Sequence, residues 1–113
     1  MVKTCQKMLP GNYPNTTVYV YQSMTKNGVV SSFPAPAIIA KKGVPVTVTW
    51  ANKIKGKHIL PVEYNHPFMD DDMFRLEVPT VTHLHGGCNP HTSDGLPERY
   101  YTASGKRAEM YTT

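Results

Sequence analysis

The chain has 113 residues, a length that suits one domain with a single modest core. Charged residues make up 18% and hydrophobic residues 40%, which excludes intrinsic disorder, and no apolar run approaches the roughly 20 residues of a membrane span. The net charge of +4 comes from lysines spread over several loops without interleaved aromatic residues, which argues against a nucleic-acid partner. Ten prolines and eight glycines, among many Val, Thr and Tyr residues, predict an all-β domain of short strands.

The first half of the chain alternates turn signals with β-rich runs. Residues 1–16 are expected to form an irregular N-terminal arm, and residues 17–23 a strand. Asn27-Gly28 predicts a tight turn, and the proline-spaced residues 31–37 predict an extended segment at a sheet edge. Residues 45–50 then alternate valine and tryptophan with threonine, which predicts a strand with its Val/Trp face inward.

The second half holds fewer periodic segments. Residues 51–77 form the longest polar interval; residues 59–62 are expected to pack onto the domain, and the rest is predicted to be a surface loop. Residues 80–85 are predicted to be a strand. Residues 88–97 are expected to be a loop, and residues 108–112 the start of a further strand. A Greek-key sandwich or barrel would close such a set of strands.

The most informative segment is Thr82-His83-Leu84-His85-Gly86-Gly87. On a strand, residues i and i+2 project to the same face, so His83 and His85 would point together, roughly 6–7 Å apart at about 3.3 Å rise per residue. Two imidazoles at that spacing can reach one metal ion or two neighbouring ones, and copper is well served by imidazole. Leu84 would face the other way, into a core. An isolated pair of this kind is more often structural.

The surrounding residues carry a resemblance. Val78–Gly87, followed by Ser93-Asp94-Gly95-Leu96-Pro97-Glu98, resembles the first copper-binding segment of multicopper oxidases, in the branch with spore-coat laccases, bilirubin oxidase and phenoxazinone synthase. Phe33–Gly43 and Val44–Asn52 are similar to the Pro-x-Pro-x-Ile segment of that family and to its following strand, which ends in Trp-x-Asn. The resemblance covers about residues 17–113 and implies the first, cupredoxin-like domain of such an oxidase.

The resemblance also implies roles. In these oxidases the first histidine of the motif binds the type 2 copper of a trinuclear cluster, and the second binds a type 3 copper. The resemblance thus implies that His83 binds the type 2 copper and His85 a type 3 copper. Asp94 matches an acidic residue near the water channel of the cluster, where a carboxylate can orient water and relay protons. Ser93-Asp94-Gly95 is also good turn chemistry without any catalytic role.

The chain departs from the family in what it lacks. It has one H-x-H motif and five histidines, whereas the resembled oxidases use several such motifs and a His-Cys-His segment for their blue copper. The expectation is therefore an incomplete sandwich, a truncated or split oxidase whose remaining polypeptide or a further chain completes the sheet and the cluster. Oxygen and a small reducing substrate would be its other partners. No signal peptide is visible in residues 1–12, so the compartment stays open.

Two alternatives remain open at this point. His83, His85, Cys88 and His91 place four metal-type side chains within nine residues, as a stand-alone protein with a mononuclear zinc or copper site would need. A β-domain that associates with a partner through open strand edges, without metal, is the second. Cys5 and Cys88 permit one disulfide, but the sequence does not show whether they meet.

Overall fold

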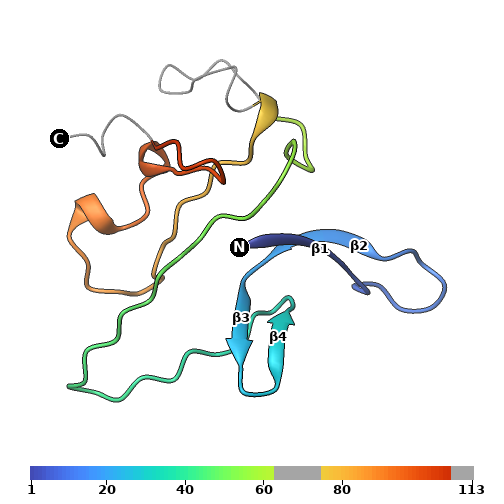
Figure 1. The fold of residues 1–113 in the computed structure, drawn as a ribbon. Coiled ribbons are helices and arrows are strands. Elements are labelled where there is room, and N and C mark those ends of the chain that lie inside the picture. Colours follow the sequence, from blue (N-terminus) through green and yellow to red (C-terminus); the bar gives the residue numbers. More distant parts are fainter. Residues whose placement is uncertain (63–74, 108–113) are drawn as a thin grey trace. The chain divides into compact units, whose positions relative to one another are not determined.

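A computed structural model describes residues 1–62 and 75–107 (Figure 1). The chain divides into two compact units, Met1–Ala51 and Asn52–Thr113. The predicted strand start at residues 108–112 lies outside the described residues. The complete elements within the described ranges are four strands and two single-turn 3-10 helices: β1 (Val2–Gln6), β2 (Thr16–Val20), β3 (Gln22–Thr25), β4 (Gly28–Ser31), η1 (His91–Ser93) and η2 (Pro97–Arg99).

The prediction of an all-β chain is confirmed. The strands form two antiparallel sheets of two strands each, and within the described ranges they do not close into a barrel. This arrangement is consistent with an incomplete cupredoxin-like fold.

The first sheet contains a strand that the sequence did not predict. β1 pairs with β2 from Val2 opposite Val20 to Gln6 opposite Thr16, so the first residues of the expected irregular arm are strand (Figure 1). The burial of β1 alternates along its length, as a half-covered strand requires. A five-residue segment with one valine carries little β signal by itself. Its conformation comes from the ladder with β2, in which the paired residues are ten to eighteen positions apart.

The second sheet is a hairpin built around the predicted turn. β3 pairs with β4 from Gln22 opposite Ser31 to Thr25 opposite Gly28, so Lys26 and Asn27 form the two-residue connection. Of the turn residues only Gly28 has a positive φ, +110°, and the Thr25 hydroxyl donates to the Gly28 carbonyl at 2.9 Å. The predicted turn is therefore present, with glycine taking the backbone conformation that a side chain would disfavour.

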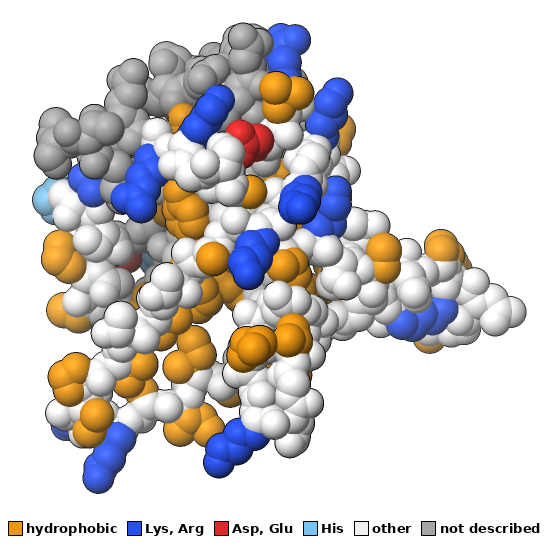
Figure 2. Space-filling view, viewed as in Figure 1, with side chains coloured by type: hydrophobic (Ala, Val, Ile, Leu, Met, Phe, Trp, Pro, Cys, Tyr) orange, Lys and Arg blue, Asp and Glu red, His pale blue; other side chains and the backbone are white. Residues whose placement is uncertain are grey.

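The alternating segment at residues 45–50 is not a strand, and this prediction is wrong. Val46 and Val48 are 55% and 42% exposed, and Trp50, which packs against Tyr21 at 4.8 Å between ring centroids, is 36% exposed. No described strand is hydrogen-bonded to this segment. An alternating pattern buries its apolar face only where a neighbouring layer covers it. Hydrophobic side chains accordingly reach the visible surface among the basic ones (Figure 2).

Each unit has a small core. In the first unit the buried apolar side chain is Val20, at 4% exposure. In the second unit the buried residues are Asn52, Ile54, Val78, Tyr100 and Thr102. The prediction of a surface loop from residue 51 onward is thus wrong at its start, because Asn52 and Ile54 are anchored in that core. Residues 63–74 of the interval lie outside the described part of the chain.

Candidate metal centre

The histidine motif lies in a loop that is closed at its base by Thr80 and Tyr101. Each of these residues donates its backbone N–H to the carbonyl of the other, at 3.0 and 2.9 Å, which forms an isolated antiparallel bridge. Tyr101 also bridges to Arg107. The predicted strand at residues 80–85 is therefore reduced to one paired residue, Thr80. We call residues 80–101 the histidine loop.

Asn52 holds the base of the histidine loop together from within the core. Its side-chain amide donates to the carbonyls of Val78 at 2.7 Å and Tyr101 at 3.1 Å, while its side-chain oxygen accepts from the N–H of Ile54 at 2.9 Å. At 7% exposure, this polar side chain replaces the strand neighbours that the loop base lacks. Sequence reasoning noted Asn52 only as the end of a motif. The available signal was an amide directly after an apolar run.

A second polar contact stabilises the same end of the loop. Ser104 donates to Glu77 from its hydroxyl at 2.8 Å and from its backbone N–H at 3.2 Å. These hydrogen bonds, the one from the Ser104 hydroxyl first, hold the pKa of Glu77 below its ordinary value against a smaller opposing effect of burial. The carboxylate therefore stays ionised beside the segment that leads into the histidine loop.

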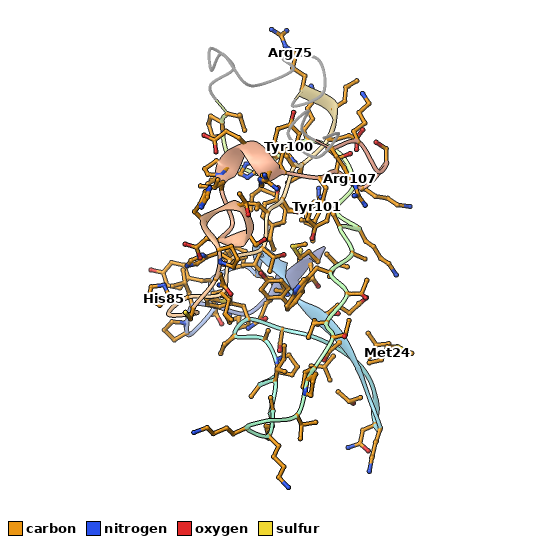
Figure 3. The ribbon with its side chains drawn as sticks, turned by 90° about the vertical axis from the view of Figure 1, so that its left-hand side faces the viewer. Met24, Arg75, His85, Tyr100, Tyr101 and Arg107 are labelled. Carbon is orange, nitrogen blue, oxygen red and sulfur yellow. The ribbon has the colours of Figure 1, made fainter. Side chains whose placement is uncertain are left out.

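His83 directly precedes a tight turn at residues 84–87, and His85 lies within that turn. Gly87 N–H donates to the Leu84 carbonyl at 3.0 Å, and Gly86, with φ of +71°, takes the third position of this turn. A positive φ at that position is typical of a type II turn and favours glycine. His85 thus lies in a turn and not on a strand, and Leu84 is 66% exposed instead of entering a core. Figure 3 shows His85 well away from Tyr101 at the loop base.

The imidazoles of His83 and His85 nevertheless lie close together. Their ring centroids are 5.8 Å apart and the planes are nearly perpendicular, at 86°. This separation is close to the spacing expected for residues i and i+2 on a strand, although a turn produces it here. Both residues are exposed. Two neighbouring imidazoles open to solvent can accept metal ions without any displacement of a core.

A contact across the histidine loop holds His83 in one orientation. The Nδ1 atom of His83 lies 2.6 Å from the backbone carbonyl oxygen of Asp94 and 3.3 Å from its carboxylate Oδ1. A carbonyl oxygen only accepts hydrogen bonds, so Nδ1 must carry the proton. The lone pair of the neutral ring is then on Nε2, which is the atom left to bind a metal. About half of the His83 and Asp94 side chains is exposed, at 46% and 49%.

This arrangement suits copper. Imidazole is a good copper ligand, and metal-binding histidines usually donate their second ring N–H to a carbonyl or carboxylate. His83 makes that contact to both kinds of oxygen on Asp94. The two histidines alone cannot complete a copper coordination sphere. Further ligands would have to come from outside the described residues.

The alternative site of four side chains does not form. Although His83, His85, Cys88 and His91 all lie in the described part of the chain, no group of three or more metal-type side chains gathers there. His91 begins η1, with the N–H of Asp94 directed at its carbonyl. Cys88 is exposed, and like Cys5 it is a free thiol. The geometry therefore pairs His83 with Asp94 on one side and with His85 on the other, and leaves Cys88 and His91 aside.

Comparison with known proteins identifies the relatives of the chain. No protein-family model matches it, and neither does a solved structure. It is 41% identical over 90 residues to Multicopper oxidase LPR1 homolog 1 of Oryza sativa subsp. japonica, which covers 80% of the chain. It is 33% identical over 110 residues, 97% of the chain, to a laccase of Bacillus subtilis. The chain belongs to the multicopper oxidase family.

The family assignment covers a limited part of each relative. A laccase of Bacillus stratosphericus is a further match, at 41% identity over 79% of the chain. This multicopper oxidase chain spans 15% of the length of the Oryza relative and 20% and 16% of the two laccases. Copper follows as the cofactor of the family. Within the described residues, none of the helices has the length and apolar character needed to cross a membrane.

Proposed function

We propose that the chain supplies two ligands to the trinuclear copper cluster of a laccase-like oxidase. His83 would bind the type 2 copper through Nε2, and His85 would bind one of the type 3 coppers. The observation that carries this proposal is the contact of 2.6 Å between His83 Nδ1 and the Asp94 carbonyl oxygen, in a chain of the multicopper oxidase family. The ring of His85 lies beside it, with its centroid 5.8 Å from that of His83. When bound, the coppers would collect electrons one at a time from a small substrate and deliver them to O2.

Asp94 has the chemistry to handle the protons of that reaction. Reduction of O2 to water consumes four protons along with four electrons. A half-exposed carboxylate 3.3 Å from the ligand His83 can take protons from solvent and orient a water beside the cluster. In this proposal its backbone carbonyl holds the ligand while its side chain serves the water. The remaining ligands and the electron-accepting copper would come from the rest of the oxidase polypeptide or from another chain.

Copper binding by single variants tests the ligand assignment. The assembled oxidase that contains this chain, reconstituted with Cu(II), is compared with its His83→Ala and His85→Ala variants by metal analysis and by the electron paramagnetic resonance spectrum of the type 2 copper. His83→Ala should lose the type 2 signal, and His85→Ala should lose copper without losing that signal. His91→Ala is the matched control, because this histidine is exposed in the same loop and outside the proposed ligand set. It should bind copper as the wild type does.

Two outcomes decide against the proposal. A type 2 signal that survives in His83→Ala would show that this residue is not the ligand. If His91→Ala and Cys88→Ser lose as much copper as the His83 and His85 variants, the result would favour the four-ligand site of a stand-alone metal protein. In a complete oxidase, His83→Ala should also abolish O2 reduction and keep the blue band, since the blue copper is bound elsewhere.

A further inference from the structure

Gly95 lies where the two sides of the histidine loop approach most closely. A Cβ atom built at this position would lie 2.7 Å from the Cβ of His83, and 3.0 Å from both the His83 Cα and the Thr82 carbonyl oxygen. Real Cβ atoms essentially never come within 3.0 Å of a heavy atom outside their own residue and its two chain neighbours. The atoms it would meet belong to the backbone or to the first carbon of a side chain. None of them can move aside by a simple rotation.

The backbone conformation of Gly95 adds a second requirement. Its φ is +83°, in the region that glycine enters without steric cost. Gly105, in the same unit, has a similar φ of +89°, yet a Cβ there would meet nothing within 4 Å. The two glycines therefore share the positive φ, but only Gly95 also has close neighbours. Only at Gly95 does the missing side chain make room for His83.

We infer that Gly95 is a positioning residue for His83. Because residue 95 has no side chain, the 94–95 segment lies against the His83 backbone, and the Asp94 carbonyl reaches His83 Nδ1 at 2.6 Å. That contact selects the Nδ1–H tautomer and presents Nε2 outward. A side chain at position 95 would push residue 94 away, so that Nδ1 loses both oxygens of Asp94 and the ring can take either tautomer. The role in copper binding rests on the proposed function, whereas the selection of the tautomer does not.

The tautomer is measured first, on metal-free protein. Long-range 1H–15N spectra distinguish Nδ1–H from Nε2–H imidazole, with exposed His91 as an internal reference. Wild-type His83 should be the Nδ1–H form alone. Gly95→Ala should give a mixture resembling His91, and Gly105→Ala, which shares the strained φ, should keep the wild-type pattern. A merely structural role for Gly95 would not move the tautomer.

Copper affinity is measured second, on the assembled oxidase that contains this chain, by competition with a chelator of known affinity. Loss of the contact that orients a metal-binding histidine weakens metal binding by about 10–100-fold, so Gly95→Ala should fall by that factor relative to Gly105→Ala. The inference is overturned if Gly95→Ala keeps the Nδ1–H form and binds copper within about twofold of the control. It is overturned equally if wild-type His83 proves to be a mixture, a result that does not depend on whether the variant folds. A wild-type protein with the Nδ1–H form but no copper affinity would contradict the proposed function while supporting the role of Gly95 in selecting the tautomer.

Discussion

The second unit should be much less stable after removal of the Asn52 side chain than after removal of an exposed amide side chain. The Asn52→Ala substitution deletes two donors and one acceptor that join Ile54, Val78 and Tyr101. The Tyr101 carbonyl keeps the N–H of Thr80 as a donor at 3.0 Å, so it is not left unsatisfied. The Val78 carbonyl and the Ile54 N–H lose the partner that Asn52 provides, in residues that are each 2% exposed.

The size of the effect follows from these two groups. A buried polar group left without a partner costs about 1–3 kcal/mol, so the two groups together should lower the free energy of unfolding by about 2–6 kcal/mol. Small domains are stable by only about 5–15 kcal/mol, which makes this a large share. Asn52→Asp should be at least as harmful, because it keeps the acceptor for Ile54 but turns a carboxylate toward two carbonyl oxygens.

Urea unfolding followed by 1H–15N spectra provides the assay, since it reports the two units separately. Amides of the second unit, such as those of Ile54 and Tyr101, should lose their native signals at lower urea in Asn52→Ala, while amides of the first unit report any global effect. Asn89→Ala is the control: an exposed asparagine of the same unit, which should change stability by less than about 0.5 kcal/mol. A loss in Asn52→Ala no larger than that of the control would refute the reasoning.

Two further predictions concern the same end of the histidine loop. Because the folded state lowers the pKa of Glu77, its contribution to stability is present above the ordinary value of 4.5 and is lost as the pH falls through the lowered pKa. Glu77→Gln should therefore flatten the acid limb of thermal melting curves, and an unchanged limb would contradict the role of Ser104. The Tyr101 hydroxyl is buried without a hydrogen-bond partner among the described residues, so Tyr101→Phe should leave the melting temperature unchanged or raise it. A clear fall in the melting temperature would indicate a partner for the hydroxyl.

The sequence was most informative about features that depend on a few consecutive residues. The H-x-H motif with its glycines and the Ser-Asp-Gly segment predicted the family, and the relatives confirm it. The β character of residues 17–23 and the turn after them are also local properties. β2 and β3 cover most of these residues, but the single predicted strand is divided at Tyr21 between two sheets, and the turn joins β3 to β4. The copper ligands and the role of Asp94 stay predictions. The contacts among the described residues do not test them.

The strands at residues 45–50 and 80–85 could not be decided from periodicity. An alternating pattern states which side chains would share a face, but a strand exists only where a neighbour supplies hydrogen bonds. Within the described residues no neighbour pairs with residues 45–50, and Thr80 alone finds one in Tyr101. β1 is the reverse case, because a segment of weak local signal becomes a strand through its ladder with β2.

The sequence by itself thus determined the residue types of the candidate centre, their order and the family to which they belong. The tertiary structure alone decided how they meet: His85 in a turn, His83 held by the Asp94 carbonyl, and Gly95 leaving room for that contact. The physical reason is the range of the interactions. Motif chemistry and turn propensity act over a few residues, whereas hydrogen bonds such as those of Asn52 to Val78 and Tyr101 join segments 26 and 49 residues away.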